Sequence, residues 1–106
     1  MTREASRLKL HSKLVEILGS QYVYYQSPES VKMHYPCIRY NLDYMYNEYA
    51  NDRNYVNEER YMVTYISKDP DDELPAALIG EFSKCSFDRF YTADNMNHWV
   101  FTLYFK

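Results

Sequence analysis

The sequence predicts an α+β domain in which a four- or five-stranded, mostly antiparallel sheet carries two helices on one face. Two segments repeat apolar residues at three- and four-residue steps, as amphipathic helices do. Five others are rich in β-branched and aromatic residues, and most alternate as half-buried strands do. The order is α-β-β-β-α-β-β, and most connections suit hairpins; only the crossover through the second helix is expected to join parallel strands. With 106 residues, of which 46% are hydrophobic, the chain predicts a single domain over residues 1–106.

The first two elements are a helix and a short strand. Residues 3–18 place an apolar stripe on one side and charges on the other; the stripe consists of Leu10, Leu14, Ile17 and Leu18. Gly19 follows the last apolar residue and is a typical helix stop. Gln21–Gln26 then predicts a strand, which the sequence SPES interrupts.

The second and third strands form the centre of the predicted sheet. Cys37–Tyr46 alternates, and one face, predicted to pack on the core, carries Ile38, Tyr40, Leu42, Tyr44 and Tyr46. Pro36 can open this strand but cannot lie inside a central one. Arg60–Ser67 is apolar on both faces, so we expect it at the centre of the sheet.

A second helix and two closing strands complete the domain. Asp72–Phe82 has helical spacing, and Asp71 or Asp72 can cap its N-terminus. Cys85–Tyr91 and His98–Phe105 predict the last strands, and the second of them alternates most clearly in the chain. Its predicted core face carries Trp99, Phe101, Leu103 and Phe105. The sheet face without helices is expected to be rich in tyrosine, and to need a partner or to tolerate water.

Composition excludes several classes of function. The net charge is −3, with 12 basic and 15 acidic residues and no basic run, which argues against a protein that grips nucleic-acid phosphates. No apolar run approaches membrane-spanning length, and the N-terminus MTREASRLKL lacks the apolar region of a signal peptide. Two cysteines are too few for a disulfide scaffold, so we expect free thiols in a reducing cytoplasm.

No pattern of catalytic or metal-binding residues is convincing. His34-x-x-Cys37 has metal-ligand spacing, with Cys85 and His98 as possible further ligands, but structural zinc sites normally show two close ligand pairs. Asp69, Asp71, Asp72 and Glu73 lack the glycine and distal glutamate of a calcium loop, and helix capping explains them more simply. With two glycines there is no phosphate-binding loop. We therefore predict no enzyme activity, no cofactor and no metal.

The segment Asn47–Glu58, NEYANDRNYVNE, separates the two central strands and is polar yet studded with tyrosine. It is either a solvated loop or the end of a long hairpin that acts as an interaction arm. Tyrosine and arginine are frequent at the energetic centres of interfaces, and long structureless loops are uncommon in compact domains. We favour the arm, and predict these interface residues: Tyr44, Tyr46, Tyr49, Asp52, Arg53, Tyr55 and Glu58.

Nearly the whole chain resembles the small tail-terminator (tail-completion or neck) proteins of tailed bacteriophages. The resemblance rests on four stretches: RLKLHSKLVEILGS, VYYQSPESVKMHYPCIRY, RYMVTYISKDPDDELPAAL and CSFDRFYTADNMNHWVFTLYF. It is one of pattern, without a catalytic signature. It implies an α+β fold whose sheet is flanked by helices.

The resemblance also implies a structural virion protein, assembled in the host cytoplasm and located in the tail or neck. Such proteins form a ring, usually a hexamer, that caps the tail tube, joins it to the neck or connector proteins and lets double-stranded DNA pass without specific binding. The alternative from the residues alone is a small cytoplasmic protein-binding or regulatory module that uses its tyrosine-rich sheet face and its hairpin.

Overall fold

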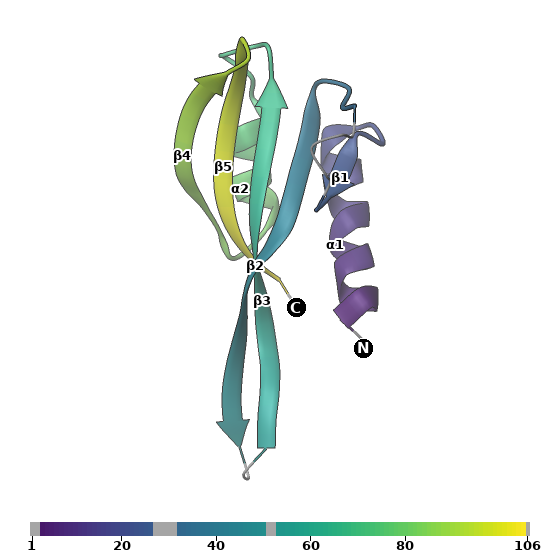
Figure 1. Ribbon diagram of the computed structural model, residues 1–106, viewed down its shortest axis with the longest axis vertical. Helices are drawn as coiled ribbons and strands as arrows, with labels where there is room; N and C mark the ends of the chain where they lie inside the picture. The colour runs from purple at the N-terminus through teal and green to yellow at the C-terminus, as the bar shows by residue number, and fades with distance from the viewer. Residues whose placement is uncertain (1–2, 27–31, 51–52, 106) are drawn as a thin grey trace.

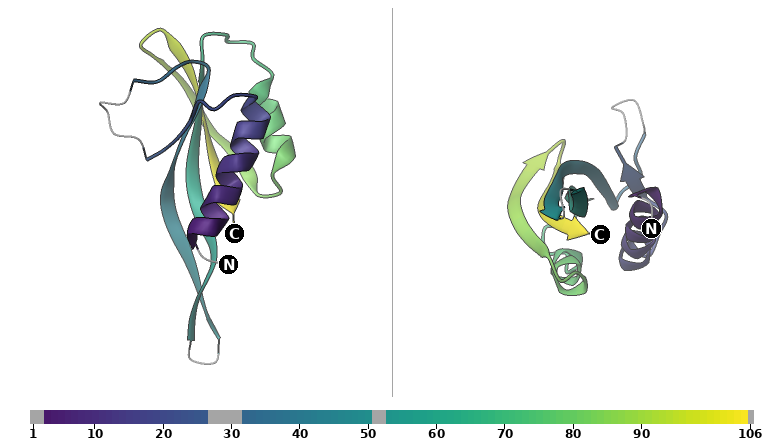
Figure 2. Two further views of the ribbon diagram at one scale, coloured as in Figure 1. Left: turned by 90° about the vertical axis from the view of Figure 1, so that its right-hand side faces the viewer. Right: turned by 90° about the horizontal axis from the view of Figure 1, so that it is seen from below.

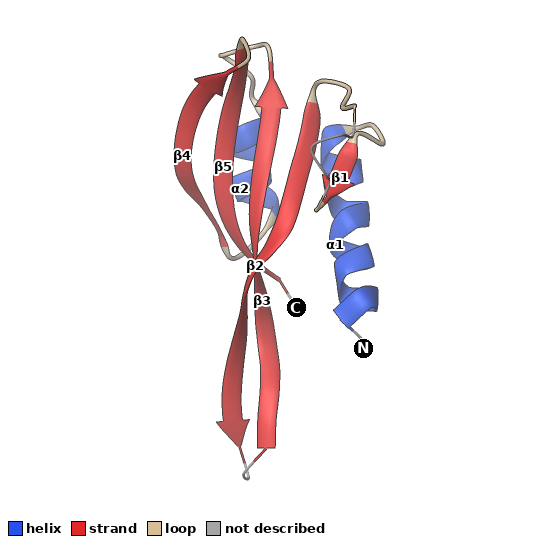
Figure 3. Cartoon of the chain, in the orientation of Figure 1, coloured by secondary structure: helices blue, strands red, loops and turns tan. Residues whose placement is uncertain are grey.

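The computed structural model describes the backbone of residues 3–26, 32–50 and 53–105, and the side chains of residues 5–26, 32–43 and 59–105. The elements follow the predicted order, and the α+β fold class is confirmed. They are α1 (Arg3–Leu18), β1 (Val23–Tyr25), β2 (Cys37–Ala50), β3 (Arg53–Ser67), α2 (Leu74–Glu81), β4 (Cys85–Ala93) and β5 (Met96–Phe105). The five strands form one sheet in the order β1-β2-β3-β5-β4, with both helices on the same face (Figures 1 to 3).

All neighbouring strands are antiparallel except β1 and β2, which run parallel. We expected only the crossover through the second helix to join parallel strands, and this is wrong. That crossover does connect β3 to β4, but β5 lies between them and is antiparallel to both. The loop after β1 instead returns the chain to the start of β2, so that Val23 lies opposite Ile38.

The core lies between the helices and the sheet, and it uses the faces that alternation predicted. Leu10 and Leu14 of α1 and Leu78 of α2 pack on inward-facing residues of β2, β3 and β5. The sheet contributes Val23, Ile38, Tyr40, Tyr61, Val63, Tyr65, Trp99, Phe101 and Leu103. Burial of this apolar area is the main source of stability.

Local signals explain where α1 ends and where β4 and β5 are joined. Gly19 has a φ of +79° and donates its N–H to the Val15 carbonyl at 2.8 Å, which closes α1. Asp94 and Asn95 also have positive φ, of 53° and 61°, and form a two-residue turn. The connection is therefore shorter than the predicted loop over residues 92–97, because both strands continue up to the turn.

Asp72 links the start of α2 to the sheet. One carboxylate oxygen accepts the Leu74 N–H at 3.0 Å, and the other accepts the hydroxyls of Tyr65 and Ser67. Burial opposes the charged form, but these hydrogen bonds outweigh it, and the pKa of Asp72 is lowered. The prediction that Asp71 or Asp72 caps this helix is wrong, because the helix begins at Leu74 and its N-cap is Glu73, which makes no side-chain capping hydrogen bond.

Among the residues whose side chains are described, tyrosines lie on both faces of the sheet. Tyr40, Tyr61 and Tyr65 point to the helix side and are buried. A small second cluster of Cys37, Ile66 and Met96 lies on the helix-free face. The tyrosines whose side chains are described on this face are Tyr24, Tyr91 and Tyr104.

Candidate interaction arm

Strands β2 and β3 continue as a two-stranded ribbon beyond the rest of the sheet (Figure 1). Pairing of β3 with β5 ends at Glu59 and Phe105, and β1 pairs only with residues 38–40 of β2. Beyond this point, within the described part of the chain, the two strands pair only with one another, down to Ala50 opposite Arg53. We call residues 47–50 and 53–58 the arm. It helps to give the molecule its elongated dimensions of 51 × 26 × 23 Å.

The backbone of the arm shows the hairpin that one of the two predicted alternatives required. The sequence predicted strands that stop at Tyr46 and resume after Glu58, whereas β2 reaches Ala50 and β3 begins at Arg53. The described part of Asn47–Glu58 is therefore a hairpin and not a structureless loop. Alternation alone missed these strand ends because polar residues such as Asn and Glu have low strand propensity.

Two shifts of register separate the arm from the sheet. One lies between Leu42 and Tyr44, and the other between Tyr46 and Asn47. Leu42 is opposite Tyr61, a core residue, but Tyr44 is opposite Arg60, which belongs to the other face. The regular pairing predicted from Ile38 to Tyr46 is therefore interrupted after Leu42, because an extra residue in one strand shifts the register; the side chains of Tyr44 and Tyr46 lie outside the described residues.

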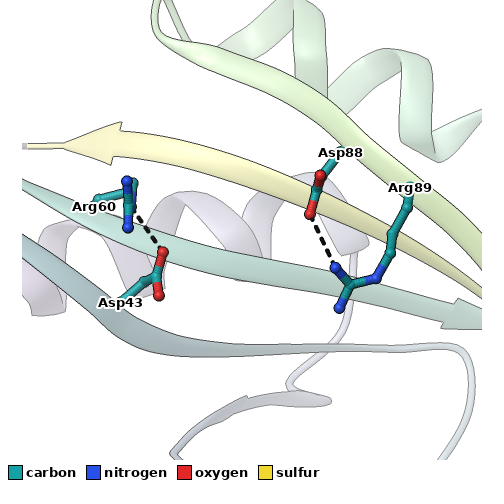
Figure 4. Close-up of polar contacts among 4 residues, drawn as sticks. All are labelled: Asp43, Arg60, Asp88 and Arg89. Atoms are coloured by element: carbon teal, nitrogen blue, oxygen red, sulfur yellow. Dashed lines mark hydrogen bonds and ion pairs between the residues drawn. The ribbon is translucent and has the colours of Figure 1, made fainter.

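Two polar contacts lie at the base of the arm. Arg60 Nε and Asp43 Oδ2 form an ion pair at 2.7 Å, beside the first register shift (Figure 4). A hydrogen bond with Tyr104 is the main cause that raises the pKa of Arg60, followed in the same direction by Asp43, so Arg60 stays cationic. On the helix side, the Tyr61 hydroxyl donates to Glu59 Oε2 at 2.7 Å, and Glu59 is only 7% exposed. These contacts fix the point where the ribbon leaves the sheet.

The arm and its base hold the backbone of six predicted interface residues. Tyr46 lies opposite Glu58, Tyr49 opposite Asn54, and Glu48 opposite Tyr55 in the register. Tyr44 and Arg53 lie at the two ends of this segment, and Asp52 lies outside the described residues. The sequence did not single out Asp43 and Arg60 at the base, because nothing in the alternation marks a bulge.

The cysteine and histidine residues considered for metal binding do not share a site. Cys37 lies in the cluster on the helix-free face, whereas Cys85 packs against the core on the helix side. The rings of His34 and His98 stack on Tyr22 and Tyr91, at 5.1 and 4.6 Å between centroids. Across the part of the chain whose placement is described, no three His, Cys, Asp or Glu residues are grouped to hold a metal ion.

Neither thiol is activated for nucleophilic chemistry. Burial raises the pKa of Cys37 to about 11, although Arg39 acts in the opposite direction. Burial likewise raises the pKa of Cys85 to about 11. Both side chains are therefore protonated near neutral pH, whereas a nucleophilic cysteine needs a thiolate.

The described core residues all lie outside the hairpin, so packing of the core does not account for it. Among the described residues, no helix is long and apolar enough to cross a membrane. Comparison with protein-family models, with curated proteins and with solved structures finds no match to this chain.

Proposed function

We propose that this chain is a structural assembly protein whose arm binds a neighbouring subunit. The observation that carries the proposal is the arm itself, a ribbon whose strands pair only with each other while the core is built elsewhere. An isolated two-stranded hairpin is marginally stable in water. A partner that covers the ribbon would supply the packing that the domain does not.

The sequence of the arm suits a protein contact. Residues 47–58 contain two tyrosines and one arginine, the residue types enriched at interface centres, together with Glu48, Asp52 and Glu58. Both outer edges of the ribbon present unpaired backbone groups to any chain that approaches them. The arm thus offers backbone hydrogen bonds as well as aromatic side chains.

On the resemblance to tail-terminator proteins, we propose that the assembly is a virion ring of the tail or neck, a hexamer, formed in the host cytoplasm. It would cap the tail tube, bind tail-tube and neck or connector proteins, and let double-stranded DNA pass. The net charge of −3 supports a lumen that does not hold DNA tightly. In this proposal the chain has no catalytic role and takes no cofactor.

A second candidate is a small cytoplasmic protein-binding or regulatory module. It is favoured by the helix-free sheet face, where Met62, Thr102 and Tyr104 are only partly buried. Such a module would be a monomer or dimer, and it would bind one partner through this face. The oligomeric state separates it from the ring.

Replacing Tyr49 and Tyr55 by serine in one chain tests the arm. We expect the melting temperature to stay nearly unchanged, because exposed substitutions usually alter stability by within about ±0.5 kcal/mol. Native mass spectrometry should show loss of the assembly, or of its binding to tail-tube protein. Tyr91→Ser is the matched control, because it removes a tyrosine from the helix-free face.

Three outcomes would contradict this proposal. Unfolding of the Tyr49→Ser/Tyr55→Ser variant would place these tyrosines in the core. Monomeric wild-type protein, with and without tail-tube protein, would exclude the ring. Loss of partner binding in Tyr91→Ser alone would favour the second candidate.

A further inference from the structure

Strand β1 covers only a short part of the outer edge of β2. It pairs with residues 38–40, whereas β2 extends to Ala50. Within the described residues, no other strand pairs with β2 on this side. The next N–H on this edge, that of Leu42, donates instead to the side-chain oxygen Oε1 of Gln26 at 3.3 Å. Beyond Tyr40 the strand edge is therefore open, with a single side chain at its start.

The backbone of Gln26 adopts an unusual conformation at this point. Its φ is +44°, in the left-handed region that residues other than glycine rarely adopt. Its N–H donates to the Tyr40 carbonyl at 2.9 Å, which closes β1. Strain of this kind persists where the surrounding structure requires it, often at binding sites. Here the side-chain amide returns to β2, where Oε1 is occupied and Nε2 keeps its N–H donors for another partner.

Arg39 and Asn41 lie beside Gln26 and add further donors. Ile38 packs in the core on the helix side, as Tyr40 does, so Arg39 and Asn41 belong to the helix-free face. The side chains of Gln26, Arg39 and Asn41 line one open hollow of about 470 Å³. Arg39 is partly buried, and no acceptor for its guanidinium is found in the described part of the chain. The hollow thus combines several hydrogen-bond donors with one positive charge that lacks a partner.

The other described arginines of this face each have a carboxylate partner. Arg60 pairs with Asp43 at 2.7 Å, and Figure 4 shows both side chains on this face. Arg89 pairs with Asp88 at 3.3 Å. A guanidinium such as that of Arg39 fits an anion with two oxygens, a carboxylate or a phosphate. A nucleic-acid backbone fits poorly, because it needs several unpaired cations, and two aspartates lie on the same face.

We propose that an extended segment of another protein binds along the outer edge of β2 beyond β1 and places a glutamate or aspartate side chain in this hollow. The carboxylate accepts hydrogen bonds from the Arg39 guanidinium and from Gln26 Nε2. The occupant is a polypeptide because an open strand edge, which a further strand can extend, lies directly beside these donors. The site is separate from the arm, so the inference does not rest on the arm proposal.

The test titrates a capped peptide, Thr-Val-Glu-Val-Thr, into the isotope-labelled chain and follows amide shifts by NMR. The amides of Gln26 and of residues 40–43 should shift in a saturable manner. The same peptide with glutamine in place of glutamate should bind at least about fivefold more weakly. Equal binding of the two peptides, or no saturable shift of these amides at about 10 mM peptide, would overturn the inference. Shifts confined to residues 53–58 would overturn it too, because they place the peptide on the arm.

Two substitutions test the donors. Gln26→Glu keeps an oxygen for the Leu42 N–H but replaces the donor amide by a negative charge, so binding of the glutamate peptide should fall by about tenfold or more. Arg39→Gln should abolish the preference for glutamate over glutamine. Arg89→Gln is the matched control, because it removes an arginine of the same face that has its own carboxylate, and it should leave binding unchanged. A preference that survives Arg39→Gln, or is lost in Arg89→Gln, would overturn the inference.

Further measurements separate this site from the arm and from other anions. Thermal melting checks that each variant is folded, and if Gln26→Glu is not, Arg39→Gln carries the test, because this arginine has no described partner to lose. Tyr49→Ser/Tyr55→Ser should bind the peptide as the wild type does, whether or not it still assembles, so that the two proposals can fail independently. Loss of peptide binding in that variant would overturn the inference. So would a DNA oligonucleotide that shifts the same amides at lower concentration than the peptide does.

Discussion

Some tyrosines of this chain are core residues and others are partly or largely exposed. The core tyrosines are those whose hydroxyls meet a buried polar partner. Tyr40, Tyr61 and Tyr65 are almost fully buried, and their hydroxyls contact His11, Glu59 and Asp72. A buried hydroxyl without a partner is costly, so each ring can enter the core only where a polar group meets its tip. Composition predicted half-buried strands and interfaces, and could not show which tyrosines have such partners.

His11 and Arg7 illustrate this at the contact between α1 and the sheet. His11 Nδ1 lies 2.7 Å from the Tyr40 hydroxyl, and the Arg7 guanidinium lies 4.5 Å from the centre of the Tyr25 ring. Burial and the nearby Arg7 both lower the pKa of His11, which favours the neutral imidazole. The polar side of the helix thus contributes to packing, a role that an amphipathic pattern does not reveal.

Asp72→Ala should destabilise the fold. The Tyr65 hydroxyl, on a side chain that is 1% exposed, would lose its acceptor, and such a loss costs about 1–3 kcal/mol. Chemical denaturation measures the change in free energy of unfolding. Asp71→Ala, at an exposed neighbouring carboxylate, should have a much smaller effect. Equal effects of the two substitutions would contradict the role given to Asp72.

The same residue predicts a dependence on pH. The pKa of Asp72 is lowered from its ordinary 3.8, so its charged form contributes stability above pH 3.8 that is lost as the pH falls through the lowered value. The wild type should therefore lose more stability on acidification below about pH 4 than Asp72→Asn does. Parallel loss in both proteins would show that Asp72 makes no such contribution.

Phe101→Ala should be among the most damaging single substitutions. Phe101 is fully buried at the centre of the core, and truncating such a residue costs about 3–5 kcal/mol. Phe87→Ala removes the same side chain from a half-exposed position in contact with Phe101, and it should cost well under half as much. Thermal and urea denaturation compare the two variants, and similar losses would contradict the assignment of Phe101 to the core.

At the level of elements, the helices and hairpins could largely be predicted from the sequence. The helix predicted over residues 3–18 has those same ends, and β5 begins two residues earlier than predicted. Local rules suffice here, since a 3.6-residue period, a glycine stop and strict alternation are properties of a short stretch. The ends of β2 and β3 could not be predicted in this way, because pairing between two polar strands leaves no apolar alternation.

Hydrogen exchange should distinguish the arm from the rest of β3. Amides of residues 60–66 lie between β2 and β5 and should exchange slowly, whereas those of residues 53–58 face a single neighbouring strand and should exchange faster in the isolated chain. Binding of a partner should slow exchange in residues 53–58 selectively. Equal protection of both stretches in a monomer, or no change in the assembly, would contradict the arm as a contact.

At the level of the whole molecule, the sheet order places β1 and β4 at its two outer edges, and the arm projects along the long axis (Figure 1). Among the residues whose side chains are described, large apolar ones that remain 40% to 49% exposed occur in distant parts of the sequence, such as Leu8 of α1 and Phe90 of β4.

The sequence by itself determined the α+β class, the order of its elements and most of the core, because periodicity and turn residues act locally. It also marked Asn47–Glu58 as a segment that the core does not need. Only the tertiary structure decided the parallel pairing of β1 with β2, the two register shifts at the base of the arm and which large apolar side chains stay exposed. These features depend on which distant strands become neighbours, and that is settled by packing of the whole chain rather than by any short stretch of it.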